Sequence, residues 1–196
     1  YAEKILDPWN DGYIPNATYP NLKDYPAGKT SEIVGVFRIE EPAYNWSNAN
    51  YQRPAKEELV IYELLIRDFA SAHNYDAVIE KLDYLQWLGI NAIELMPVME
   101  FEGNESWGYM PMFMMAPDKY YGPRNELKRL VDSCHARGMA VILDIALNHS
   151  FGQNPMVRMY FDPNAGQWGQ TSSQSPWFNS LAKHDFNLGY YYNHQS

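Results

Sequence analysis

The chain has 196 residues, of which 46% are hydrophobic, and a formal net charge of −9. Its length and apolar content are enough for one domain or for parts of two. The negative charge argues against a nucleic-acid partner, because phosphate binding needs a basic surface. No run of about 18 apolar residues occurs, so we expect no membrane span.

The compartment stays undefined by the sequence, and both a cytoplasmic and an exported protein are compatible with it. The first residues lack the apolar segment of a signal peptide. Cys134 is the single cysteine, so no internal disulfide indicates an oxidising environment. Its place on a helical apolar stripe predicts a small buried hydrophobe rather than a nucleophile.

The composition and strand pattern of residues 1–56 predict the end of a small β-domain followed by a linker. This part is rich in Pro, Gly, Asn and Tyr. It contains one convincing strand, over residues 32–39, which lies between turn signals. Too little of it is apolar for an independent domain. We therefore expect a second domain to begin near residue 57 and to continue to residue 196.

The second domain alternates between strand and helix patterns. The predicted strands cover residues 59–66, 90–96 and 139–145, each a short apolar run. The third run is almost wholly apolar and rich in branched side chains, which is typical of a strand covered on both faces in a parallel sheet. Alternating β and α units imply right-handed crossovers and a parallel sheet, so the fold class is α/β.

Helices are predicted between these strands. Apolar residues from 78 to 88 follow helical spacing, with Asn74 as the N-cap and Gly89 as the terminator. A second helix carries its apolar residues on one face and ends at Gly138. Long connections, at residues 97–123 and from 150 onward, follow the second and third strands. In such folds, function gathers in the loops that leave the C-terminal ends of strands.

The third strand delivers an acid, an amide and an imidazole together at its exit: Asp144, Asn148 and His149. An ionisable group in an apolar run costs several kcal/mol unless it is paired. A structural aspartate that ties down the following loop, beside a surface histidine, is the alternative to a functional site here.

Several motifs resemble the α-amylase family of glycoside hydrolases and transglycosidases. DIALNH, residues 144–149, is similar to the signature at the end of that family's third barrel strand. Other segments follow in the family's order: VIYELLIRDF at 60–69, LGINAIELMPV at 88–98, and SWGYMPMFMMAPDKYYG at 106–122. The resemblance implies the N-terminal part, about three β/α units, of a TIM (β/α)₈ barrel. Residues 150–196 resemble the short excursion after the third strand.

The upstream segment KILDPWNDG resembles the exit of the immunoglobulin-like domain that precedes the barrel in branching, debranching and neopullulanase-like members. The resemblance thus implies that residues 1–56 are the end of such an accessory domain plus a linker. One departure lies in the final segment, YYYNHQS. There Tyr192 and Gln195 replace the acid and the glutamate of the family's DFNHE-like pattern.

The resemblance also implies roles for individual residues. His149 would hydrogen-bond the sugar at the cleaved bond, and Tyr109 would stack beneath that sugar. Asp144 would orient the site, and Asn148 would tie the loop or bind calcium. Trp107, beside Tyr109, is a further candidate substrate-binding residue. Packing inside the loop is the alternative for Trp107 and Tyr109, and a loop-capping role is the alternative for His149.

The family's catalytic carboxylates lie after its fourth, fifth and seventh strands, and we find no such strands here. We expect no catalytic residue in this chain, and we expect the chain alone to be inactive and to need the remainder of its own chain or a second copy. The predicted activity is retaining hydrolysis of α-glucans such as starch or glycogen. Alternatives are a 1,4-α-glucan branching enzyme or other transglycosidase, and a non-catalytic sugar-binding or scaffold barrel.

A separate alternative comes from the residues themselves. Glu63, Glu94 and Asp144 lie on three successive predicted strands and would converge inside a barrel, where carboxylates could build a metal or proton-transfer site. No cofactor is required by the hydrolase hypothesis, and calcium at Asn148 has no acidic cluster in the sequence to support it.

Overall fold

In the computed structural model, the residues whose structure is described are 42–103, 105–164, 170–171, 174–178 and 190–191. The predicted strand over residues 32–39, most of the predicted accessory domain, and Tyr192 and Gln195 lie outside these residues. Within the described ranges, no helix is long and apolar enough to cross a membrane.

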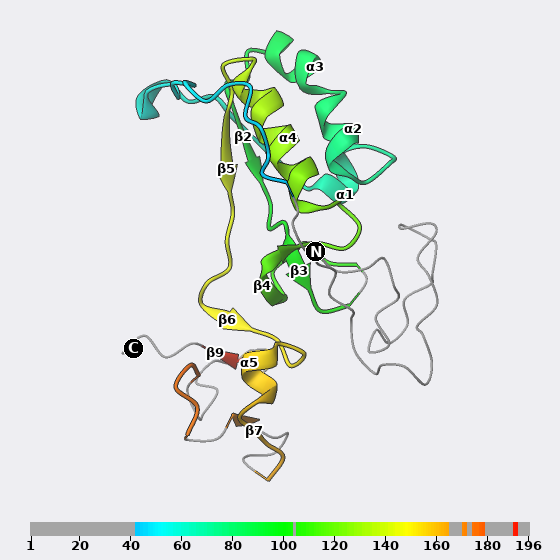
Figure 1. Ribbon diagram of the computed structural model, residues 1–196, viewed down its shortest axis with the longest axis vertical. Helices are drawn as coiled ribbons and strands as arrows, with labels where there is room; N and C mark the ends of the chain where they lie inside the picture. Colours follow the sequence, from blue (N-terminus) through cyan, green and yellow to red (C-terminus); the bar gives the residue numbers. More distant parts are fainter. Residues whose placement is uncertain (1–41, 104, 165–169, 172–173, 179–189, 192–196) are drawn as a thin grey trace.

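A parallel sheet is the centre of the described structure. Its strands are β1 (Ile61–Leu64), β2 (Ala92–Leu95) and β5 (Ala140–Leu143), in the order β1-β2-β5 (Figure 1). All three predicted strands are confirmed in type, order and parallel direction. Each is shorter than its apolar run, because only the central residues of the runs form ladder pairs.

The helices lie along one side of this sheet (Figure 1). They are α2 (Tyr75–Ile79), α3 (Leu82–Trp87) and α4 (Arg124–His135). The predicted N-cap is confirmed, since the Asn74 side chain accepts a hydrogen bond from the Ala77 N–H at 3.0 Å. The chain turns out of α3 at Gly89, whose φ is +85°.

The single helix predicted between residues 74 and 89 was wrong in one respect, because the structure divides it into α2 and α3. At the junction the Lys81 N–H bonds to the Val78 carbonyl, three residues back, instead of continuing the α-helical pattern. Leu88, placed on the apolar stripe, is 44% exposed.

The hydrophobic core fills the space between the helices and one face of the sheet. The strands contribute Leu64, Ile93 and Leu95, and the helices contribute Leu82 and Leu130, all of them buried. Cys134 of α4 is buried in the same core, as predicted, and burial raises the pKa of its thiol to about 12. It is therefore a packing residue and not a nucleophile.

The expectation that the third strand is covered on both faces was wrong for this chain. Leu143 at the end of β5 is 45% exposed, and Ile145 and Leu147 beyond it are 47% and 63% exposed. The helices cover only one face of the sheet, and β5 is also the last strand of the described sheet, with no described neighbour on its outer side. The opposite edge strand, β1, also exposes an apolar residue, Ile61, at 45%. The sheet is therefore open, with two apolar edges.

The sequence suggested a simple loop after β2, and the structure shows that this was wrong. The connection forms an antiparallel hairpin of β3 (Met99–Phe101) and β4 (Pro111–Pro117). A buried ion pair holds this hairpin: the Lys119 Nζ lies 2.8 Å from Glu100 Oε1, and the Lys119 N–H donates to Glu100 Oε2 at 2.7 Å. Burial raises the pKa of the Glu100 carboxyl, and the Lys119 charge opposes this rise.

The segment after β5 forms a small separate layer beyond the hairpin (Figure 1). It contains α5 (Pro155–Arg158) and two short antiparallel pairs, β6 (His149–Ser150) with β9 (Tyr190–Tyr191) and β7 (Phe161–Asp162) with β8 (Gln170–Thr171). The buried Ser150 hydroxyl donates to the Pro111 carbonyl at 2.8 Å, which anchors this layer to β4.

Residues 44–51, which precede β1, pack along α4. Asp132 accepts hydrogen bonds from the Ser47 N–H at 2.9 Å and the Asn48 N–H at 3.0 Å. Burial raises the pKa of this carboxyl, but the hydrogen bonds outweigh it and the net shift is downward. The Tyr51 ring stacks on His135 at 3.9 Å between centroids. A 3₁₀ turn, η1 (Lys56–Glu58), then leads into β1, and α1 (Ile66–Phe69) follows that strand.

Lys119→Met should destabilise the fold by about 3–5 kcal/mol, because it leaves Glu100 buried without its cation. The double variant Glu100→Gln/Lys119→Met should recover much of this loss. Urea unfolding of the polypeptide measures both. A matched control is Arg129→Met, which breaks the half-exposed pair with Asp76 and should cost about 0–1 kcal/mol. Equal midpoints for Lys119→Met and the parent would contradict this account of the hairpin.

Candidate functional site

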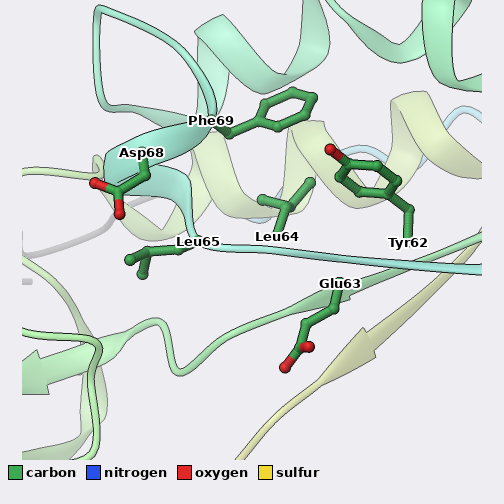
Figure 2. Close-up of a pocket in the computed structure, with 6 residues that line it drawn as sticks. All are labelled: Tyr62, Glu63, Leu64, Leu65, Asp68 and Phe69. Atoms are coloured by element: carbon green, nitrogen blue, oxygen red, sulfur yellow. The ribbon is translucent and has the colours of Figure 1, made fainter.

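Three carboxylates share the sheet face that the helices do not cover. Glu63 of β1 is the register partner of Glu94 of β2, and Glu94 is the partner of Ile142 of β5. Asp144 lies two residues beyond Ile142, so its side chain belongs to the same face. Its N–H donates to the Leu95 carbonyl at 3.0 Å, which extends the pairing of β2 and β5 by one residue at the C-terminal ends of the strands. Figure 2 shows Glu63 pointing away from its neighbours on the helix side of β1.

Tyr109 connects the loop before β4 to this acidic face. Its hydroxyl donates a hydrogen bond to Asp144 Oδ2. This bond is the largest cause of a rise in the pKa of Tyr109 to about 12, followed by burial and then by the negative charges of Asp144, Glu63 and Glu94. The phenol is therefore a protonated donor at neutral pH, and it ties the loop to the end of β5.

His149 lies against the backbone of the same loop. Its Nε2 is 2.8 Å from the Tyr109 carbonyl oxygen, and its Nδ1 is 3.0 Å from Asn148 Oδ1. A carbonyl accepts only, so Nε2 carries the proton of this bond. A neutral ring then accepts at Nδ1, which requires Asn148 to present its amide N–H group. A protonated ring donates to both oxygens.

The loop that carries Trp107 and Tyr109 has one strict steric requirement. Gly108 has a φ of +94°, and a Cβ at this position would lie 2.6 Å from the Pro97 carbonyl oxygen, so only glycine fits. The Gly108 N–H donates to the Ser106 hydroxyl at 3.0 Å. Trp107 is 62% exposed, so it is not packed inside the loop. The loop thus exposes the Trp107 ring to solvent and directs the Tyr109 hydroxyl to Asp144.

The structure thus brings four predicted site residues into one hydrogen-bonded group: Tyr109, Asp144, Asn148 and His149. Trp107 lies in the same loop. Their roles toward a sugar stay predictions. Sequence reasoning missed Arg67, whose Nη1 donates to the Ser106 carbonyl at 3.3 Å. The signal was available, because Arg67 is a cation directly after the apolar run of the first strand.

A depression of about 330 Å³ follows the free edge of β1 (Figure 2). It is lined by Tyr62, Glu63, Leu64, Leu65, Asp68 and Phe69. Its lining mixes apolar side chains with the carboxylates of Glu63 and Asp68 and comes from the segment of β1 and α1, whereas Tyr109 bonds to Asp144, beyond the end of β5. The depression shares Glu63 with the acidic face, but none of its lining residues belongs to the hydrogen-bonded group.

The described residues offer little support for a metal site at Asn148. This side chain is exposed and bonded to His149, and the Asp144 carboxylate is engaged by Tyr109. Among the residues whose structure is described, no three His, Cys, Asp or Glu side chains gather to hold an ion. They therefore do not by themselves fit calcium, which takes six to eight oxygen ligands.

Parallel strands joined by helices, with a polar group at the C-terminal ends of the strands, are the arrangement found in the first part of a (β/α)₈ barrel. The sequence model described as "Alpha amylase, catalytic domain" matches residues 36–188. The chain belongs to this family.

Individual relatives agree with this assignment. A malto-oligosyltrehalose trehalohydrolase from Saccharolobus solfataricus is 37% identical over 146 residues, which are 74% of this chain and 25% of the relative. A 1,4-alpha-glucan branching enzyme from Cupriavidus pinatubonensis is 30% identical over 178 residues, which are 84% of this chain and 24% of that enzyme. The chain therefore spans about a quarter of the length of these curated relatives.

Solved structures share the fold. The crystal structure of a putative alpha amylase from Salmonella typhimurium has a TM-score of 0.58 and 32% identity, and the match covers 70% of this chain and 24% of that one. An alpha-amylase from Lactobacillus plantarum, at 20% identity, has a TM-score of 0.55 over 71% of this chain and 32% of its own. This second match bears on the fold alone.

Asp144→Asn should lower the pKa of Tyr109 from about 12 toward the ordinary value of about 10, because it removes a charged acceptor. The bond to Asp144 stabilises the fold below the unfolded-state pKa of tyrosine, and this contribution is lost as pH rises through the folded-state value. NMR titration of ¹³Cζ-labelled tyrosine, assigned with Tyr109→Phe, measures the shift. An unchanged Tyr109 titration in Asp144→Asn would show that this hydrogen bond does not form.

Proposed function

We propose that the protein containing this chain is a glycoside hydrolase that cleaves α-glucosidic bonds in α-glucans with retention of configuration. The observation that carries the proposal is the hydrogen-bonded group of Tyr109, Asp144 and His149 at the strand ends of an α-amylase family chain. No cofactor is needed for this chemistry, and calcium at Asn148 stays a prediction.

In this proposal the chain supplies the binding of one sugar ring. Tyr109 offers its ring face, since its hydroxyl is held by Asp144. Both nitrogens of His149 have partners within the chain, so a sugar hydroxyl has to replace one of them. Asn148 is exposed and can turn away at little cost, which makes Nδ1 the position for the sugar. Exposed Trp107 is the candidate for a neighbouring ring.

We assign the bond-breaking carboxyl groups to residues outside this chain. Retaining glycosidases need a nucleophile and an acid about 5–5.5 Å apart on either side of the scissile bond. Asp144 is engaged by Tyr109, and Glu63 and Glu94 act on the Tyr109 hydroxyl through their charge. These three carboxylates hold and polarise the sugar-binding group in the proposed mechanism. The alternative of a metal or proton-transfer site built on them has no further observation in its favour.

The relatives suggest two substrate types. The names of one group contain malto-oligosyltrehalose, and the branching enzyme acts on a 1,4-alpha-glucan. We propose hydrolysis of a malto-oligosaccharide-type substrate first, because the trehalohydrolase shares 37% identity with this chain against 30% for the branching enzyme. Branching is the second candidate, supported by the longer match of 84% of this chain. The apolar open edges of β1 and β5 support closure by the remainder of the chain or, as the alternative, by a second copy.

The complete polypeptide should release trehalose from malto-oligosyltrehalose, or reducing sugar from soluble starch, whereas the 196-residue chain alone should release neither. The reason is that the proposed nucleophile and acid lie elsewhere. A reducing-sugar assay, a trehalose assay and the iodine absorbance of amylose separate hydrolysis from branching. Turnover by the short chain would overturn the assignment of the carboxyl groups, and an inactive complete polypeptide would favour a sugar-binding scaffold.

In the complete polypeptide, His149→Ala should lower kcat/KM by about 10²-fold or more with little change in Tm, because it removes contacts made in the transition state. Steady-state kinetics and thermal unfolding measure the two effects. His135→Ala is the matched control: this histidine is the last residue of α4 and stacks on Tyr51, and its loss should leave the rate unchanged. Equal rates for His149→Ala and the parent would remove His149 from the site.

A further inference from the structure

Arg67 is a buried cation beside the loop that carries Trp107 and Tyr109. It lies in α1, directly after β1, and is 9% exposed. Its Nε and Nη2 donate to the two carboxylate oxygens of Asp68 at 2.7 and 2.8 Å. This bidentate bond fixes the plane of the guanidinium. It is also the main cause of a lowered pKa for the Asp68 carboxyl.

The third nitrogen of the same group points at the loop. Arg67 Nη1 donates to the Ser106 carbonyl at 3.3 Å and lies 3.6 Å from Glu105 Oε1. Ser106 in turn accepts the Gly108 N–H, and Gly108 is pressed against Pro97. The backbone between Ser106 and Tyr109 is therefore held at its start by Arg67 and at its middle by a steric contact.

A second buried cation holds the loop further upstream. Lys119 Nζ donates to the Gly103 carbonyl at 3.0 Å, while its ion pair with Glu100 belongs to the hairpin. Lys119 thus fixes the start of the loop at Gly103, and of the two cations Arg67 contacts the residue that lies nearer in sequence to Trp107 and Tyr109. Burying a guanidinium is costly unless its donors are satisfied, and here the donors go to the partner carboxylates and the loop.

We infer that Arg67 is a positioning residue of the sugar site, acting through the Ser106 carbonyl to place Tyr109 against Asp144. The inference rests on the proposed function and deepens it. Lysine cannot replace arginine in this role, because a single ammonium lacks the planar fork that serves Asp68 and the Ser106 carbonyl together. A misplacement of about 1 Å in a substrate-positioning group can cost about 10²-fold in rate.

The test is a double-mutant cycle in the complete polypeptide, with kcat and KM measured on the α-glucan substrate that the parent turns over. Arg67→Met should lower kcat/KM by about 10–100-fold. In a Tyr109→Ala background the same substitution should cost less than about threefold further, because the residue that Arg67 positions is gone. Arg129→Met, which breaks the pair with Asp76 on the outer surface, is the matched control and should be neutral.

A second readout does not depend on activity. In Arg67→Lys, which keeps the charge and serves if Arg67→Met does not fold, the pKa of Tyr109 should fall from about 12 toward about 10 as the bond to Asp144 is lost. A role in stability alone would lower Tm without moving this titration. An unchanged Tyr109 titration in Arg67→Lys overturns the role of Arg67. The role is also overturned if the losses in kcat/KM from Arg67→Met and Tyr109→Ala multiply in the double variant. A fully active Tyr109→Ala variant, found together with a shifted Tyr109 titration in Arg67→Lys, overturns the proposed function and leaves the positioning contact intact.

Discussion

The parallel register of β1, β2 and β5 is the constraint on which the rest of the structure depends. It pairs Glu63 with Glu94 and places Asp144 on the same face, one step beyond the ladder. Parallel strands end at the same edge of a sheet, so the residues that follow them meet in space although they are far apart in the sequence. The helices cover the other face with apolar side chains, which leaves the acidic face uncovered in the described structure.

Ordering a long loop over that edge costs conformational entropy, and polar contacts oppose this cost. Tyr109 bonds to Asp144, His149 bonds to the Tyr109 carbonyl, and Gly108 permits the close approach to Pro97. Arg67 and Lys119 donate hydrogen bonds to the carbonyl oxygens of Ser106 and Gly103 in this loop. Charged groups are expensive to bury unless they are paired, and here the carboxylates of Asp68 and Glu100 and the carbonyl oxygens of the loop serve as their partners.

The described sheet is open on both sides. β5 and β1 each expose apolar residues that a closed barrel would cover. The match to about a quarter of each curated relative agrees with a sheet that holds the first strands of a larger barrel. In the function we propose, this part of the barrel binds and orients the sugar, and the remainder supplies the carboxyl groups that cleave the bond.

The sequence by itself determined the strands, their parallel order, the Asn74 cap, the burial of Cys134 and most of the site group, because periodicity, capping and short motifs are local properties. Only the tertiary structure decided the rest. The β3–β4 hairpin depends on Glu100 and Lys119, which lie 19 residues apart, and the loop depends on Arg67, 39 residues before Ser106. The exposure of β5 depends on which strand lies beside it. Such contacts cannot be predicted from periodicity, because the residues next to each partner in the sequence do not indicate which distant residue it contacts.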